Sequence, residues 1–286
     1  MTTIAFLGLG AMGLRMATNL QVARHKLRVY NRSPDRCPSL LSSGAALFST
    51  PRETAQNADI VFSMVTDDKA SQAIWLDEKS GAVLGLQQST IAIECSTLSV
   101  SWCKTLAKKI ATKGATFIDA PVVGSRPQAE AKQLIHLVGG EQTILEQVRD
   151  ILNTSAVIVH HVGKTRAGMS MKLAVNALFG IQTAALAEIL GLLSKAGIPK
   201  DTAVSLLNNL PTTSPALKGI GTLIADENYA PLFPINLVEK DFCYLEELAT
   251  SVHARTPSAT LVRQIYQQAK NSGYSEHNIA GIAQLY

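Results

Sequence analysis

The sequence predicts an α/β protein in which a doubly wound parallel sheet is followed by an all-helical domain built on a long central helix. Three observations support this prediction. Short, continuous apolar runs alternate with helix-like segments through the first half of the chain. Strand signals stop near residue 163, and an almost unbroken apolar stretch then spans residues 173–193. We therefore expect two domains, residues 1–162 and residues 163–286.

The expected strands are runs of apolar and β-branched residues, whose continuity indicates burial on both faces of a sheet. They lie at residues 4–7, 27–30, 60–64, 91–94 and 116–119, with further signals at 134–138 and 156–160. Helix-like segments fall between them at 12–23, 70–75 and 99–113. This alternation predicts right-handed crossovers and a ligand site at the carboxyl ends of the strands.

The apolar stretch at 173–193 raises the question of a membrane span. It carries Asn176, Gln182, Thr183 and Glu188, and lipid-facing helices seldom contain such polar groups. We therefore expect a central helix buried on most sides and no membrane partner. A helix so apolar all round also favours a homo-oligomer, either a dimer or a tetramer.

Composition limits the class of protein and its partners. The 286 residues are 47% hydrophobic and 17% charged, which excludes a disordered chain, and the net charge of +4 gives no argument for nucleic acid. The four cysteines contain no CxxC pair, as expected of free thiols in a reducing compartment. No basic segment precedes the first apolar run, so we expect a cytoplasmic protein.

The first chemical signal is a GxGxxG motif that follows an expected strand and opens an expected helix. In such a motif the glycines permit a tight turn and let the backbone approach a pyrophosphate at the helix N-terminus. The context makes the motif a strong prediction of a bound dinucleotide. The residues expected to contact it are Gly8, Leu9, Gly10, Ala11, Met12 and Gly13.

The end of the second strand predicts which dinucleotide is bound. An acidic residue there usually accepts hydrogen bonds from the adenosine ribose of NAD. This chain has Asn31 and Arg32 instead, and a guanidinium can hold the 2′-phosphate that a carboxylate would repel. We therefore expect NADP(H) to be preferred, with NAD(H) possible.

Two more strand ends border the expected cofactor. Val65 and Thr66 follow one strand and Thr97 follows the next, and we expect all three on the ribose and nicotinamide side. Asp67 or Asp68, and Ser99, precede helical segments and are expected to act as helix caps.

These motifs together resemble the β-hydroxyacid dehydrogenase family, which includes 3-hydroxyisobutyrate dehydrogenase, tartronate semialdehyde reductase and the glyoxylate/succinic semialdehyde reductases. The resemblance covers essentially the whole chain. It implies a Rossmann domain, an all-helical domain and an active site between them. The matching segments are Gly8–Leu20 (GLGAMGLRMATNL), Asn31-Arg32, Asp119-Ala120-Pro121-Val122, residues 163–176 and Lys240-Asp241.

The resemblance implies that Lys172 is the catalytic lysine, that Asn176 anchors the substrate, and that Lys240 reaches the cofactor. The spacing of four places Lys172 and Asn176 one helical turn apart on one face. Burial in a closed site would lower the pKa of the lysine from about 10.4. It could then protonate the carbonyl oxygen as hydride arrives. For Lys240 the adjacent acids are expected on other faces of the helix.

The substrate loop departs from the family pattern. Where relatives commonly read Pro-Val-Ser-Gly, this chain reads Pro121-Val122-Val123-Gly124, so Val123 removes one hydroxyl donor. The backbone N–H groups of Gly124 and Ser125, and the Ser125 hydroxyl, are expected to hold the substrate carboxylate. The next residues, Arg126-Pro127-Gln128-Ala129-Glu130, look like the glyoxylate/succinic semialdehyde reductase branch. Lys132 and Arg166 stand where glycine is usual in the family.

Other arrangements give no site. His160 and His161 are consecutive on an expected strand and so point to opposite faces, and we expect no metal. The lysines at 104, 108, 109 and 113 have helical spacing and are expected on a solvated face.

The sequence therefore predicts an NADPH-dependent reductase that converts a small aldehyde acid to the hydroxy acid, with Lys172 as proton donor. One alternative is an imine or bulkier ketone reductase, which the apolar Val123 would favour. The other is an inactive nucleotide-binding scaffold, which would bind the cofactor without turnover.

Overall fold

The computed structural model describes residues 1–33, 35 and 37–286. The chain forms two compact units, Met1–Lys172 and Leu173–Tyr286, and each is described by itself. The division lies inside one helix, later than the 162/163 position expected from the sequence. Met169, near the start of that helix, is fully buried in the apolar core of the first unit, so the first turn of the helix packs with the sheet unit.

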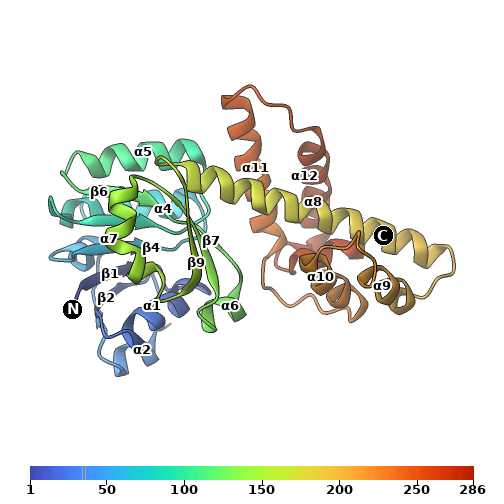
Figure 1. Cartoon of the computed structure of the whole chain (residues 1–286), viewed down its shortest axis with the longest axis horizontal. Helices are drawn as coiled ribbons and strands as arrows, with labels where there is room; N and C mark the ends of the chain where they lie inside the picture. Colours follow the sequence, from blue (N-terminus) through green and yellow to red (C-terminus); the bar gives the residue numbers. More distant parts are fainter. Residues whose placement is uncertain (34, 36) are drawn as a thin grey trace. The chain divides into compact units, whose positions relative to one another are not determined.

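The first unit alternates strands and helices (Figure 1). Its strands are β1 (Thr3–Leu7), β2 (Lys26–Tyr30), β3 (Ala46–Leu47), β4 (Ile60–Ser63), β5 (Ile91–Glu94), β6 (Thr116–Asp119), β7 (Val122–Val123), β8 (Leu134–Gly139) and β9 (Ala156–Gly163). Its helices are α1 (Gly13–Val22), α2 (Pro38–Ser42), α3 (Pro51–Ala55), α4 (Asp68–Leu76), η2 (Ala82–Gly85), α5 (Val100–Ala111), α6 (Arg126–Glu130) and α7 (Gln142–Leu152).

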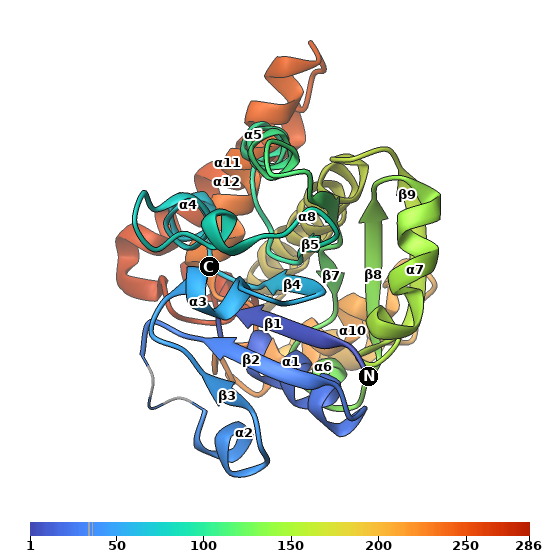
Figure 2. The same cartoon turned by 90° about the vertical axis from the view of Figure 1, so that its left-hand side faces the viewer.

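The strands form one mostly parallel sheet, as the sequence predicts. Its order is β3-β2-β1-β4-β5-β6-β8-β7, and β9 pairs with β8. Strands β1 to β6 are parallel, and Figure 2 shows β1, β2 and β4 side by side. The pairs β6–β8 and β7–β8 are antiparallel. The sequence analysis missed β3 and β7 because strands of two residues carry no readable pattern.

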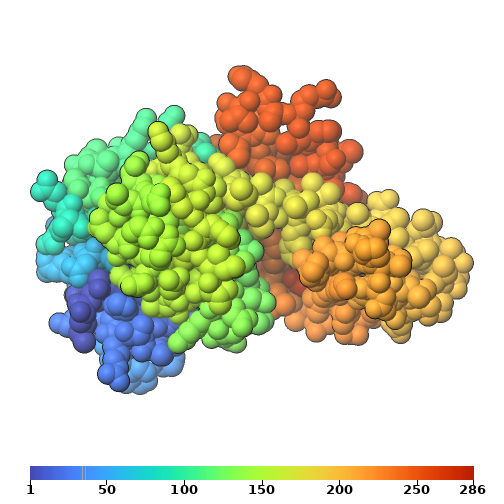
Figure 3. Space-filling model, in the orientation of Figure 1, coloured from blue at the N-terminus to red at the C-terminus, as the bar shows by residue number. Residues whose placement is uncertain are grey.

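Both faces of the sheet are covered, which explains the unbroken apolar runs in the sequence. Successive residues of β1 enter different cores: Ile4 and Phe6 belong to one cluster, whereas Ala5 and Leu7 belong to another. Phe6 stacks on Phe62 of β4 with ring centroids 5.6 Å apart. In Figure 3 the lime-green atoms of α7 and β9 form the face of this unit turned toward the viewer.

The second unit is helical. Its elements are α8 (Ala167–Lys195, which starts in the first unit), α9 (Lys200–Asn208), α10 (Pro215–Ala225), α11 (Ile235–Ser251), α12 (Pro257–Ala269), η3 (Lys270–Tyr274) and η4 (Ile279–Leu285). Its core contains Phe242 stacked on Tyr266, whose hydroxyl donates to the carbonyl of Gly180 at 3.0 Å. That contact fixes α12 against the middle of α8.

The expectation that the long apolar helix is buried on most sides is wrong. Only a third of the most apolar 18-residue window of α8 is buried. One face packs in the helical core, while Leu178, Ile189 and Leu192 are 59%, 42% and 61% exposed. By length and composition alone α8 could cross a membrane, a test that core helices of soluble proteins also pass. Its Gln182 accepts a hydrogen bond from Ser214 of the same unit.

Candidate cofactor and substrate site

The carboxyl ends of four parallel strands bring the predicted cofactor residues to one edge of the sheet. Leu7 of β1 is in register with Tyr30 of β2 and Ser63 of β4, and Ser63 is in register with Glu94 of β5. The segments that follow these strands contain the residues predicted to contact the cofactor. They are Gly8–Gly13, Asn31 and Arg32, Val65 and Thr66, and Thr97.

The glycine turn has the shape that a dinucleotide requires. Gly8 has φ 96°, and a Cβ atom there would lie 2.4 Å from the Met64 carbonyl oxygen. A Cβ on Gly13 would lie 2.0 Å from the Gly8 carbonyl oxygen. The backbone of the turn therefore packs directly against the start of α1, with no room for a side chain at Gly13. At Gly10 a Cβ would meet no atom within 4 Å. The backbone at Gly10 therefore offers the open approach that a pyrophosphate needs, and no side chain caps α1.

Asn31 is engaged by the protein itself. Its Oδ1 accepts the Leu9 N–H of the glycine turn at 2.9 Å, and its Nδ2 donates to the Ser33 carbonyl at 2.8 Å. Asn31 thus ties the turn to the end of β2, a role that the sequence analysis missed. The neighbouring Arg32 is exposed, so it is the residue of this pair whose side chain can reach a 2′-phosphate.

A buried carboxylate organises the next two loops. Glu94, fully buried at the end of β5, accepts the Ser96 N–H on Oε1 at 2.9 Å. Its Oε2 accepts from the Ser71 hydroxyl at 3.0 Å and the Trp75 indole at 3.1 Å. The Ser96 hydroxyl in turn accepts the Val65 N–H at 2.8 Å. Glu94 therefore connects the loop after β5 to the predicted cofactor residue Val65.

Burial raises the pKa of Glu94, and hydrogen bonds from Ser96, Ser63 and Trp75 partly offset this shift because they stabilise the anion. The sequence analysis did not select Glu94, although a carboxylate that ends an otherwise apolar strand is a readable signal.

The expected helix caps are confirmed. Asp67 accepts the Ala70 N–H at 2.8 Å as the N-cap of α4, and Ser99 accepts the Trp102 N–H at 3.1 Å as the N-cap of α5. Asp68 has a different role, because it accepts both the N–H and the hydroxyl of Ser99, at 2.9 and 2.6 Å. It joins the loops after β4 and β5. Thr66 donates to Asp67 at 3.2 Å.

Lys172 and Asn176 both lie on α8, one turn apart, and each is only 8% exposed. Burial is unusual for both residue types. In the second unit the Asn176 amide donates to Asp241 Oδ2 at 2.6 Å. Asp241 is 3% exposed, so this hydrogen bond is shielded from water and fixes the orientation of the amide.

Asp241 also contacts the third predicted site residue of the helical region. Lys240 Nζ lies 3.2 Å from Asp241 Oδ1 and 5.2 Å from the centre of the Tyr244 ring. The expectation that adjacent residues of a helix would keep Lys240 away from its neighbouring acid is therefore wrong, since the two charged groups form an ion pair. Asp241 joins Lys240 to Asn176, a link that the sequence analysis missed.

The substrate loop uses its groups locally. Val123 lies in β7, opposite Ile135 of β8. Ser125 is the N-cap of α6, where its side chain accepts the N–H of Gln128 and its own N–H donates to Gln128 Oε1 at 3.0 Å. The N–H that we expected Ser125 to offer to a carboxylate is thus used within a capping box in this structure, where the Ser125 hydroxyl serves as an acceptor. Gly124 has φ 122°, and a Cβ there would lie 2.8 Å from Leu134.

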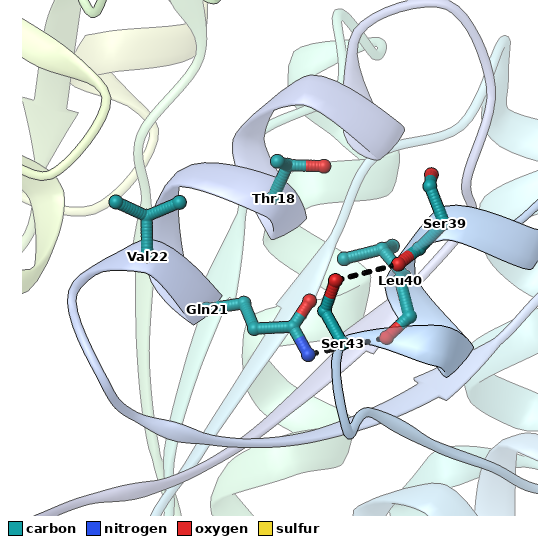
Figure 4. Close-up of a pocket in the computed structure, with 6 residues that line it drawn as sticks. All are labelled: Thr18, Gln21, Val22, Ser39, Leu40 and Ser43. Carbon is teal, nitrogen blue, oxygen red and sulfur yellow. Dashed lines mark hydrogen bonds between the residues drawn. The ribbon is translucent and has the colours of Figure 1, made fainter.

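A surface hollow lies between α1 and α2 (Figure 4). Its polar lining is hydrogen-bonded internally, with Gln21 donating to the Leu40 carbonyl at 3.1 Å and Ser43 donating to the Ser39 carbonyl at 2.8 Å. Thr18 and Val22 complete its wall. The hollow borders the last turns of α1, away from the glycine turn, so it is not the expected dinucleotide site.

Comparisons with known proteins identify the family of this chain. Residues 3–163 match the family model described as the NAD binding domain of 6-phosphogluconate dehydrogenase. Residues 167–286 match the model described as NAD-binding of NADP-dependent 3-hydroxyisobutyrate dehydrogenase. The two models meet at the start of α8.

Individual relatives cover almost the whole chain. A chloroplastic glyoxylate/succinic semialdehyde reductase 2 of Arabidopsis thaliana is 31% identical over 98% of this chain and 78% of its own length. A mitochondrial 3-hydroxyisobutyrate dehydrogenase of Drosophila melanogaster is 30% identical over 99% of this chain and 88% of its own.

Among solved structures, the 3-hydroxyisobutyrate dehydrogenase of Mycobacterium tuberculosis with L-serine has a TM-score of 0.90 at 25% identity, covering 100% of this chain and 99% of its own. The fold of this chain is therefore that of a known class of enzyme. The chain belongs to the 3-hydroxyisobutyrate dehydrogenase-related family of NAD(P)-dependent β-hydroxyacid dehydrogenases.

Proposed function

We propose that the protein is an NADPH-dependent reductase that converts a small aldehyde acid, such as glyoxylate or succinic semialdehyde, to the hydroxy acid. The observation that carries this proposal is the burial of Lys172 and Asn176, one turn apart on α8. Lysine is among the side chains least often buried, and buried ionisable groups gather at functional sites. A buried ammonium group and a buried amide on one helix face suit a substrate with an oxygen to protonate.

The chemistry divides between the cofactor and the chain. A dinucleotide whose pyrophosphate binds at the glycine turn would supply, from its nicotinamide, the hydride for the carbonyl carbon. The Lys172 ammonium donates a proton to the carbonyl oxygen and stabilises the negative charge that develops there. In the reverse direction the neutral amine removes the hydroxyl proton. Asn176, whose amide is oriented by Asp241, holds the substrate beside Lys172.

The substrate class is supported by the relatives. The Arabidopsis relative is named as a reductase of aldehyde acids, and the Drosophila relative is named as a dehydrogenase of a hydroxy acid. The mycobacterial structure is named with L-serine, which carries both a carboxylate and a hydroxyl. The preference for NADPH rests on the exposed Arg32 beside an Asn31 that is committed to the glycine turn.

The test follows NADPH and NADH absorbance with glyoxylate, succinic semialdehyde, tartronate semialdehyde, methylglyoxal and a cyclic imine. We expect turnover of an aldehyde acid with NADPH that falls by about 100-fold or more in Lys172→Met, a range typical for loss of a general acid. Lys164→Met, which removes an exposed lysine of the same segment, is the control and should match the parent.

Two results would contradict the proposal. Turnover of the imine alone would favour the imine reductase, and NADPH binding without turnover of any substrate would favour a nucleotide-binding scaffold.

We propose in addition that a second copy of this chain covers the exposed face of α8, because one apolar face on identical chains can pair with itself about a two-fold axis. The face consists of Leu178, Ala185, Ile189 and Leu192. Light scattering should give a dimer or a larger even assembly for the parent and a smaller species for Ile189→Glu. An unchanged mass for Ile189→Glu would remove this face from the interface.

A further inference from the structure

Arg126 is a half-buried cation in the segment that follows the carboxyl end of β6. It is the first residue of α6, directly after the loop Val123–Ser125. Its Nε atom is buried and has no hydrogen-bond partner in the part of the chain that the structure describes. Among the same residues its guanidinium forms no ion pair.

The groups nearest to Arg126 in the chain are already engaged. Glu130, one turn later in α6 and the usual partner for an arginine at this spacing, pairs instead with Arg15 Nε of α1 at 2.6 Å. Gln128 and Ser125 exchange hydrogen bonds with each other in the capping box. The fold thus turns the local acceptors away from Arg126.

The segment itself is held firmly. Asn19 of α1, which is buried, donates to the Ala129 carbonyl of α6 at 2.9 Å. Arg15 donates to the Ala11 carbonyl of the glycine turn as well as to Glu130. The helix that carries Arg126 is therefore fixed to the helix that follows the glycine turn, so its position is set before a ligand binds.

A buried guanidinium N–H without an acceptor lowers stability, because the group has lost water and gained no partner. An anionic ligand would restore the missing hydrogen bond and balance the charge. Planar carboxylates match the guanidinium best, since they accept two parallel N–H groups.

We propose that Arg126 binds the carboxylate of the substrate and thereby makes this reductase selective for aldehyde acids over neutral aldehydes. This inference rests on the proposed function for the aldehyde end of the substrate. Arg126 supplies a charged donor in a loop where Val123 offers no hydroxyl and the Ser125 N–H is committed to the cap of α6.

The experiment compares two small aldehydes that differ at the group in question. Glyoxylate carries a carboxylate, whereas methylglyoxal carries a neutral acetyl group. In Arg126→Gln we expect kcat/KM for glyoxylate to fall by about 10-fold to 100-fold, the range for loss of a charged hydrogen bond. For methylglyoxal it should change by less than about twofold, and the KM for NADPH should stay at the parent value. Arg126→Lys keeps the charge and should lose less.

Lys132→Gln is the matched control. It removes an exposed cation of the same segment and should leave both aldehydes unaffected. Equal losses for glyoxylate and methylglyoxal in Arg126→Gln would overturn the proposal, since Arg126 would then act on folding or on the chemical step. A raised KM for NADPH alone would overturn it too, because the anion held would be a cofactor phosphate.

A binding measurement separates this inference from the proposed function. Oxamate has the carboxylate of glyoxylate but no reducible aldehyde. Calorimetry should show oxamate binding to the NADPH complex of the parent and at least tenfold weaker binding to that of Arg126→Gln. If the parent reduces no aldehyde yet oxamate binding still depends on Arg126, the reaction is wrong and the carboxylate site stands. If oxamate binds both proteins equally, the carboxylate site is wrong.

Discussion

The carboxylate of Asp119 accepts a 2.7 Å hydrogen bond from the backbone N–H of Met169, three residues before Lys172. Its other oxygen accepts the N–H of Arg166 at 2.6 Å. A side chain at the end of β6 thus serves the N–H groups at the start of α8, which every helix leaves without partners inside the helix. Glycines make room for this contact, since a Cβ on Gly139 would lie 2.6 Å from Asp119 Oδ1. Asp119 therefore anchors the helix that carries Lys172.

Replacement of this anchor should affect stability and catalysis together. Asparagine at position 119 keeps one acceptor but turns an amide N–H toward the other donor, so Asp119→Asn should lose about 1–3 kcal/mol of unfolding free energy. We expect kcat to fall while the dissociation constant of NADPH stays within about twofold, because the glycine turn is untouched. Urea unfolding and NADPH titration measure the two effects. Asp77→Asn is the control, since Asp77 accepts two backbone N–H groups on the surface. An unchanged kcat in Asp119→Asn would contradict the anchoring role.

The same carboxyl predicts a pH dependence of stability. Burial raises the pKa of Asp119 to about 6. The N–H groups of Arg166 and Met169 and the charge of Arg166 stabilise the anion and lower the pKa, but their effect is smaller. The Cys103 thiol also faces it, and Glu94 is in register with it on β5. Because the folded chain holds the proton more tightly, this group's contribution is greatest below the ordinary value of 3.8 and is lost as pH rises to about 6.

The change in the free energy of unfolding from this group amounts to roughly 3 kcal/mol at most. Urea unfolding of the parent and Asp119→Asn between acidic and neutral pH measures it. The advantage of the parent should shrink as pH rises through this window, and an advantage that grows instead would refute the shift.

Glu94 should stabilise the loops after β4 and β5, which contain the predicted cofactor residues Val65, Thr66 and Thr97. Glutamine at position 94 keeps the shape of the glutamate side chain, but its amide NH₂ replaces one of the two accepting oxygens. The NH₂ group would then face a donor, either the Ser96 N–H or the Trp75 indole. We expect about 1–3 kcal/mol lower stability and a severalfold higher KM for NADPH, because Val65 depends on Ser96. Glu141→Gln, on the surface before α7, should match the parent. Loss of stability without any change in KM would show that the loops hold their shape without Glu94.

Two alanine substitutions test the glycine turn against each other. Gly13→Ala should destabilise the fold strongly, because its Cβ would lie 2.0 Å from the Gly8 carbonyl oxygen. Gly10→Ala meets nothing within 4 Å, so stability should change by less than about 1 kcal/mol. Its methyl group would occupy the approach of the pyrophosphate, and NADPH should bind at least tenfold more weakly. Thermal unfolding and fluorescence titration give both readings, and normal NADPH binding by Gly10→Ala would remove the turn from the cofactor site.

Arg32 should determine the choice between the two nicotinamide cofactors. Arg32→Ala removes an exposed guanidinium that makes no ion pair within residues 1–33, 35 and 37–286. The stability should therefore stay near that of the parent. Affinity for NADPH should fall about 10-fold to 100-fold, the range for a charged hydrogen bond, while affinity for NADH stays unchanged. An equal loss for both cofactors would mean that Arg32 does not contact the 2′-phosphate.

The sequence by itself determined the features that depend on neighbouring residues. The buried strands follow from continuous apolar runs, since β1 sends Phe6 to one core and Leu7 to the other. The glycine turn and the caps at Asp67 and Ser99 follow from conformational needs that extend over only a few residues. The spacing of Lys172 and Asn176 predicts their shared face because helix geometry is regular.

Only the tertiary structure decided which distant groups meet. Asp119 reaches the start of α8 from 47 and 50 positions away, and Asn176 meets Asp241 across 65 positions. Asn31 turns to Leu9, and Glu130 turns to Arg15 rather than to Arg126. The exposed face of α8 could not be read from composition, because an apolar helix looks the same whether its own chain covers it or not. Such contacts depend on how the chain folds back on itself, and a pattern of neighbouring residues does not show which distant residues come together.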